Sequence, residues 1–239
     1  MSPNKKQKEA AAREEKDWER LDNAVFKSEN FLARNSKQLL IALAVVVVIA
    51  FGYLAYKQFY AKPRNQEAQV ALFKGEVYFM QRQDSLALNG DGNGYIGFEA
   101  IIDQYGSTPA GNLAKARAGI CYASMGNYEK ALPYLKDYSG DDAIFSQLVN
   151  GTIGDCLDNL GKADEAVSYY EKAAKGVDDA AYSPVLYKKA ALIYLKQGKY
   201  DKVIDIFTLV KNNYMNSQIG AMEAEKYIEE ATLLKAGQR

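Results

Sequence analysis

Charged residues are absent from one long stretch near the start of the chain. Residues 39–56, LLIALAVVVVIAFGYLAY, are 18 consecutive uncharged side chains, with Lys37 and Lys57 closing the two ends. A helix of this length spans about 27 Å, close to the ~30 Å hydrocarbon core of a bilayer. The run has no polar face, and Tyr53, Tyr56, Phe59 and Tyr60 gather at its C-terminal end, as in an interfacial aromatic belt. We therefore predict a transmembrane helix over residues 39–56 rather than a buried core helix.

The flanks of this run favour an anchor that stays in place over a cleaved signal peptide. Residues 1–38 precede it, and no Ala-x-Ala cleavage motif follows it. The nearby basic residues are nearly balanced across the run: Lys27, Arg34 and Lys37 before it, and Lys57, Lys62 and Arg64 after it. The positive-inside rule therefore leaves the orientation open.

Beyond the anchor, one pattern of small, large and polar positions recurs three times. The blocks are SMGNYEKALPYL (Ser124–Leu135), NLGKADEAVSYY (Asn159–Tyr170) and KQGKYDKVIDIF (Lys196–Phe207). Their glycines, Gly126, Gly161 and Gly198, lie 35 and 37 residues apart, and each separates two stretches with helical spacing. Each block therefore predicts a helix–turn–helix in which the glycine allows a turn that a Cβ would obstruct.

Equivalent positions of the three blocks match in size. The first helix carries a small residue (Gly119, Gly154, Ala191) and, three positions later, a large one (Tyr122, Leu157, Tyr194). The second helix carries a small residue (Ala131, Ala166, Val203) and, four positions later, a large one (Leu135, Tyr170, Phe207). We expect the small residues to let helices approach while the large ones fill the space between them. This pattern resembles the tetratricopeptide repeat, a 34-residue unit that stacks into a solenoid.

The expected fold class is all-α: one N-terminal transmembrane helix, then a tetratricopeptide-repeat α-solenoid with a C-terminal capping helix. We place a charged tail over 1–38, the span over 39–56, a juxtamembrane linker over 57–66 and the repeat domain over 67–239. The domain divides into a degenerate unit (67–111), three clear repeats (112–146, 147–183, 184–217) and a capping helix (218–239). An enlarged loop is expected at 84–97, Met222, Ala224 and Ile228 should face the last repeat, and Pro133 should distort its helix.

Composition narrows the class of function. The chain has no histidine, which removes His-based acid–base and nucleophilic catalysis and most zinc sites, and it has no GxxxxGK[ST] or GxGxxG loop. From Asn65 onward 18 basic and 23 acidic residues give a net charge of −5, unlike a nucleic-acid binder. We expect no catalysis, no cofactor, no metal, no small-molecule substrate and no nucleic acid.

Two local features have competing interpretations. Asn89, Asp91, Asn93 and Gly94 fit an EF-hand calcium loop, but Ala100 stands where the bidentate Glu belongs, which favours a glycine-rich turn and leaves ion binding as the alternative.

Cys121 and Cys156 occupy the same position of consecutive repeats. Stacked helices lie about 8–10 Å apart and a disulfide needs Cα atoms within about 7 Å, so we predict two free, half-buried thiols.

The candidate protein-binding face is the concave row of first helices. Its predicted residues are Leu113, Arg117, Ile120, Asp155, Asp158, Lys188, Lys189, Leu192, Leu195 and Lys196. Of the slots for a carboxylate clamp only Lys189 fits, so this mixed face suits extended or unfolded segments better than one charged tail. Tyr134, Tyr138, Tyr169 and Tyr187 either pack between repeats or anchor partners. In the tail, Trp18, Leu21 and Val25, extended by Leu32, form a narrow apolar stripe that is either solvated or a docking element.

The order of charged tail, single span, repeats and cap resembles the bacterial membrane-anchored (YfgM-like) tetratricopeptide proteins. The resemblance implies an inner-membrane protein with a cytoplasmic N-terminus and periplasmic repeats. It also implies partners among Sec translocon subunits, periplasmic chaperones or emerging secretory chains. The alternatives are a scaffold for envelope assembly or cell division and, third, a calcium-regulated sensor.

Overall fold

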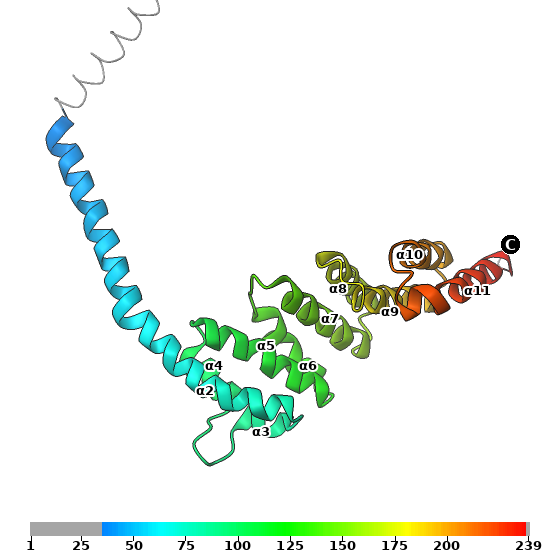
Figure 1. The fold of residues 1–239 in the computed structure, drawn as a ribbon, viewed down its shortest axis with the longest axis horizontal. Helices are drawn as coiled ribbons and strands as arrows, with labels where there is room; N and C mark the ends of the chain where they lie inside the picture. Colours follow the sequence, from blue (N-terminus) through cyan, green and yellow to red (C-terminus); the bar gives the residue numbers. More distant parts are fainter. Residues whose placement is uncertain (1–34, 238–239) are drawn as a thin grey trace, which may run out of the picture. The chain divides into compact units, whose positions relative to one another are not determined.

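The computed structural model describes residues 35–237, and every regular element in that range is helical (Figure 1). The all-α expectation is confirmed. Contacts divide the chain into two units, residues 1–61 and residues 62–239. The stripe predicted around Trp18 lies outside the described residues.

The predicted span lies within a long apolar helix, Asn35–Met80. Its most apolar 18-residue window has a mean hydropathy of 2.7 and is not buried at all within the structure. Val48 and Phe51, for example, are 70% and 69% exposed. This helix is long and apolar enough to cross a membrane. The expected linker, residues 57–66, is also helical, comprising a π-helical turn, η1 (Lys57–Ala61), and the start of the next helix.

The second unit is a series of helices, most of which pack mainly against their neighbours in sequence, while the first helix of the unit also packs against the first helix of the first pair. Three helices open it: α2 (Lys62–Met80), α3 (Asp84–Asn89) and α4 (Phe98–Tyr105). Three pairs follow: α5 (Pro109–Ser124) with α6 (Tyr128–Asp137), α7 (Ala143–Asn159) with α8 (Ala163–Gly176), and α9 (Ser183–Lys196) with α10 (Tyr200–Asn213). A π-helical turn, η2 (Ile219–Glu223), and α11 (Ala224–Gly237) close it (Figure 1).

The three pairs turn in the same way. Gly126, Gly161 and Gly198 have φ angles of +77°, +74° and +70°, in the left-handed region that side chains with a Cβ disfavour. The residue after each glycine donates its N–H to the carbonyl of the large first-helix residue: to Tyr122 at 2.8 Å, Leu157 at 2.8 Å and Tyr194 at 2.9 Å. This is the Schellman arrangement, which satisfies carbonyls that the helix end leaves open.

Within each pair, small and large residues meet. A Cβ built on Gly119 would lie 2.5 Å from Leu135 Cγ, and one built on Gly154 would lie 2.6 Å from Tyr170 Cε1. Ala191 and Phe207, the equivalent residues of the third pair, are both fully buried. The second-helix residues Ala131 and Ala166 are fully buried as well. These close approaches join the two helices of a repeat.

Tyrosine–carboxylate hydrogen bonds join the first and the third pair to the element that precedes each of them. Tyr122 donates to Glu99 and Tyr194 donates to Glu171, and both bonds link residues 23 positions apart. In the middle repeat the first-helix position holds Leu157, which has no hydroxyl, and the residue 23 positions before it is Tyr134 rather than a carboxylate. A carboxylate therefore stands 23 positions before the first-helix residue where that residue is a tyrosine, whose hydroxyl needs an acceptor, and not where it is a leucine.

The two ends depart from the expected details. The loop expected at 84–97 contains the short helix α3, whose Ala87 and Leu88 are buried. At the other end Ala224 is buried and Ile228 packs on the core, but Met222 is 75% exposed, so its predicted contact with the last repeat is wrong. The helix around Pro133 remains continuous, although α6 has 10 residues where α8 and α10 have 14.

Candidate protein-binding surfaces

The basic residue predicted for the binding face in the first repeat is engaged within the domain. Arg117 of α5 forms an ion pair with Glu76 of α2 at 2.7 Å, and the two side chains are only 20% and 24% exposed. Its guanidinium also lies 4.6 Å and 5.0 Å from the ring centroids of Phe79 and Phe145. Because this charge is paired and lies against two rings, it holds α2, α5 and α7 together.

Three predicted charges of the later repeats, Asp155, Lys188 and Lys189, are paired as well. Asp155 accepts hydrogen bonds from Lys189 at 2.6 Å and from the Tyr170 hydroxyl at 2.7 Å. Burial and the hydrogen bond to Asp155 raise the pKa of Tyr170 well above its usual range. Lys188 pairs with Glu223 of η2. The face therefore presents fewer uncompensated charges than its sequence indicates.

The remaining members of the predicted face fall into three groups. Leu113, Ile120 and Leu195 are half-buried and pack against the core, whereas Asp158 and Lys196 are exposed. Leu192 is half-buried and lines a groove together with Lys188 and Lys189.

This groove, which we call the C-terminal groove, lies between α9 and the segment 217–223. It has a volume of about 440 Å³. Its apolar lining comes from Ala181, Pro184, Val185, Leu192 and Ile219, and its polar lining from Lys188, Lys189, Ser217, Gln218 and Glu223. Since Lys188 pairs with Glu223 and Lys189 pairs with Asp155, the groove offers an apolar surface with a largely neutralised rim.

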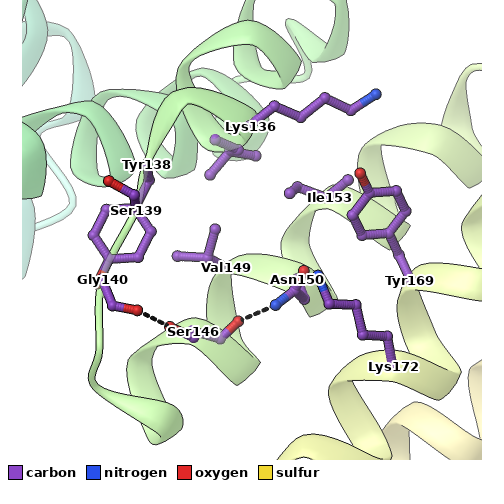
Figure 2. A pocket seen from close by; sticks show the side chains of 11 residues that line it. Lys136, Tyr138, Ser139, Gly140, Ser146, Val149, Asn150, Ile153, Tyr169 and Lys172 are labelled. Atoms are coloured by element: carbon purple, nitrogen blue, oxygen red, sulfur yellow. Dashed lines mark hydrogen bonds between the residues drawn. The ribbon is translucent and has the colours of Figure 1, made fainter.

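A second groove, the α6–α8 groove, lies between α6, α7 and α8 and has a volume of about 430 Å³ (Figure 2). Leu135, Val149 and Ile153 give it an apolar lining. The Nζ atoms of Lys136 and Lys172 lie 5.8 Å and 6.0 Å from the centroid of the Tyr169 ring. The groove therefore combines apolar side chains, an aromatic ring and two cations, which suits an acidic segment with an apolar anchor.

Sequence reasoning found only the tyrosines of the α6–α8 groove. Tyr138 and Tyr169 line it, as one of the two interpretations of the surface tyrosines allows. Tyr187 is instead 5% exposed and packs 6.2 Å from the ring of Tyr214, so it is a core residue. Lys136 and Lys172 were missed, although they come from the second helices of successive repeats, which stacking brings together.

The loop that resembles an EF-hand holds its carboxylate internally. Asp91 Oδ1 accepts hydrogen bonds from the backbone N–H groups of Asn93 (2.7 Å) and Tyr95 (3.0 Å), and Oδ2 accepts one from the Tyr78 hydroxyl (2.8 Å). The two backbone hydrogen bonds, Tyr95 first, lower the pKa of Asp91. Among the described residues, no group of three or more His, Cys, Asp or Glu side chains is placed to hold a metal ion. The geometry is that of an Asx-stabilised turn.

Both cysteines are free and fully buried rather than half-buried. Burial raises the pKa of Cys121 to about 12 and that of Cys156 to about 11. A thiol of that kind is inert at neutral pH, so these residues serve as core packing.

Comparisons with known proteins agree with this architecture. The tetratricopeptide repeat family model matches residues 149–175, which run from the middle of α7 to the end of α8. Two crystal structures of nearly identical TPR-like repeats from a Podosopora anserina kinesin light chain, one of them a single-substitution variant, each share 12% identity. They align over 73% of this chain and 97% or 98% of their own, with a TM-score of 0.50. A crystal structure of MamA shares 18% identity and aligns over 59% of this chain and 90% of its own, with a TM-score of 0.39.

No curated protein matches the sequence. The family match and the shared fold together support a tetratricopeptide-repeat protein. Such repeats are in general protein–protein interaction modules, whose extended surfaces bind other chains. At 12% identity the solved structures show the fold alone.

Proposed function

We propose that this chain is a single-pass membrane protein whose repeat domain binds other proteins and catalyses no reaction. The observation that carries the proposal is a long apolar helix ahead of a tetratricopeptide-like domain. The most apolar 18-residue window of this helix is not buried by any other part of the structure. Exposed apolar surface on this scale is costly in water and favourable in a bilayer. The helix therefore anchors the repeats at a membrane.

The chemistry of the C-terminal groove indicates what is bound. Its lysines are paired with Glu223 and Asp155, and the lining that remains is mainly apolar. A strongly charged peptide tail gains little from such a rim, whereas apolar side chains of an extended segment gain by leaving water. This supports partners that present unfolded or loosely folded apolar segments.

The resemblance to membrane-anchored repeat proteins supplies the particular setting of the proposal. The repeats lie in the periplasm of a bacterium, anchored in the inner membrane with a cytoplasmic N-terminus. The partners are translocon subunits, periplasmic chaperones or emerging secretory chains.

Co-purification from detergent-solubilised membranes tests this proposal. A Val185→Asp/Leu192→Asp variant places two charges in the C-terminal groove and should lose translocon, chaperone and client chains. The control, Thr208→Asp, adds a charge at an exposed position of α10 and should retain them. Loss in neither variant, or the absence of such partners from the unmodified protein, would argue against this function.

The α6–α8 groove favours a second candidate function, an envelope-assembly or cell-division scaffold. Its two lysines and Tyr169 suit an acidic partner, unlike the neutralised C-terminal groove, so two different proteins can be held at once. Suppression of aggregation of an unfolded client by the repeat domain separates the candidates. An adaptor for emerging chains suppresses it, and a scaffold does not.

A further inference from the structure

The helix α2 is apolar on two opposite faces. One face packs against the domain through Ala68, Leu72 and Gly75, which are buried. The other face carries Val70, Phe73 and Met80, which are 75%, 71% and 72% exposed, and the half-buried Val77. We call these four residues the α2 stripe. A helix that is apolar on all sides is normally covered on all sides, and a large exposed apolar face marks an interaction site.

The spacing of the stripe is that of a coiled coil. Val70, Phe73, Val77 and Met80 are three, four and three residues apart, which places valines at the a positions and Phe73 and Met80 at the d positions of a heptad repeat. Extending the heptad backward puts Pro63 and Gln66 in the same seam. β-branched residues at a are typical of two-stranded parallel coiled coils, although there the d positions are usually Leu and here they are Phe73 and Met80. The b, c and f positions of this heptad face the protein's own domain.

We propose that the α2 stripe pairs with the same stripe of a second copy, forming a parallel homodimer next to the membrane. Charge at the flanks supports this occupant. In a parallel pair each g position faces the e position five residues further on in the other copy, so Lys62 of each copy faces Glu67 of the other. Both side chains are exposed, and the other pair within α2, Gln69 with Lys74, brings no like charges together.

The inference rests on the proposed membrane anchoring, which fixes the parallel direction. Lys62 follows the apolar run after only five residues, so in two copies anchored in one membrane α2 begins at a similar distance from the bilayer. A short stripe is much smaller than the 20–30 residues per side of a standard interface. Confinement to one membrane raises the effective concentration enough to compensate for a small contact.

Cysteine cross-linking of the full chain in its native membrane tests the pairing. Cys121 and Cys156 are fully buried and do not form cross-links, so any disulfide-linked dimer comes from the introduced cysteine alone. Phe73→Cys, at a d position, should give a disulfide-linked dimer on mild oxidation at least about tenfold faster than Gln69→Cys, at an exposed g position of the same helix. Ser168→Cys, on α8, measures random collision.

A charge exchange tests the register. In the Val77→Cys background, Lys62→Glu opposes Glu67 of the other copy and should slow the cross-link several-fold, and adding Glu67→Lys should restore it. Phe73→Asp should reduce the cross-link at least about tenfold, because it puts a charge in the seam while leaving the folded domain unchanged by circular dichroism.

The contrary results are distinct. Cross-linking of Phe73→Cys no faster than of Ser168→Cys, or mainly to a different protein, overturns the homodimer while leaving the anchor intact. An unrestored double variant overturns the parallel register. Recovery of the chain in the soluble fraction overturns both the anchor and the pairing that depends on it.

Discussion

A single methyl group at Gly119 tests the packing within a repeat. A Cβ at this position would lie 2.5 Å from Leu135 Cγ, 2.7 Å from its Cδ2 and 3.1 Å from its backbone nitrogen. Carbon atoms in contact lie about 3.5–4.0 Å apart. Rotation of the Leu135 side chain does not relieve the contact with the backbone nitrogen, so Gly119→Ala forces α6 away from α5.

The magnitude is the difference between two opposing effects. Overpacking a dense core costs about 1–3 kcal/mol, and Leu135, only 1% exposed, has little room to move, so the upper part of that range applies. Alanine is preferred to glycine inside a helix by about 1 kcal/mol. We expect Gly119→Ala to lower the free energy of unfolding by about 1–2 kcal/mol. Gly176→Ala, with no atom within 4 Å of the new Cβ, should be neutral or slightly stabilising.

Urea unfolding of residues 62–239, followed by circular dichroism, measures both variants. A double-mutant cycle adds Leu135→Ala, which opens space for the new methyl group, so the two changes together should cost about 1–2 kcal/mol less than their sum. The packing argument is refuted if the changes are additive within about 0.5 kcal/mol. It is equally refuted if Gly119→Ala is as stable as Gly176→Ala.

Three further predictions concern titration, thiol reactivity and calcium. Burial, with a hydrogen bond to Asp178, raises the pKa of Tyr214 to about 12, above the ~10 of a tyrosine in the unfolded chain. Folding therefore favours the protonated phenol. The contribution of Tyr214 to the free energy of unfolding is complete below pH ~10 and is lost as the pH rises to about 12. Thermal unfolding should show the loss, and Tyr214→Phe should reduce it. Cys121 and Cys156 should react with a thiol reagent only as fast as the domain opens, reaching full rate in denaturant; rapid reaction in the native state would contradict their burial. Because both oxygens of Asp91 accept internal hydrogen bonds, about 1 mM calcium should leave the melting temperature unchanged, and a rise would revive the ion-binding alternative.

Local signals in the sequence predict most of the repeat architecture. A turn with a positive φ angle favours glycine, so the positions of Gly126, Gly161 and Gly198 in the sequence indicate the three turns directly. The pairing of small with large residues at equivalent repeat positions likewise predicts where two helices approach closely, as Gly119 and Leu135 illustrate. These features repeat with the period of the fold, and three copies in register strengthen each other.

Contacts that do not repeat were beyond this reasoning. Arg117 pairs with Glu76, 41 residues earlier in an irregular unit, and Lys188 pairs with Glu223 in the π-helical turn near the C-terminus. Neither partner has an equivalent in the clear repeats, so the binding face looked more charged than it is. The exposure of Met222 was also missed, because η2 has no equivalent in the clear repeats. Its π-helical turn changes which side chains face the last repeat before α11 begins.

Membrane topology tests the central claim most directly. A protease-sensitive tag at the C-terminus is probed in intact cells, after permeabilisation of the outer membrane, and after full lysis. An anchored protein with periplasmic repeats predicts cleavage that begins only when the outer membrane is opened, with the chain recovered in the inner-membrane fraction. Protection until full lysis would place the repeats in the cytoplasm and contradict the account.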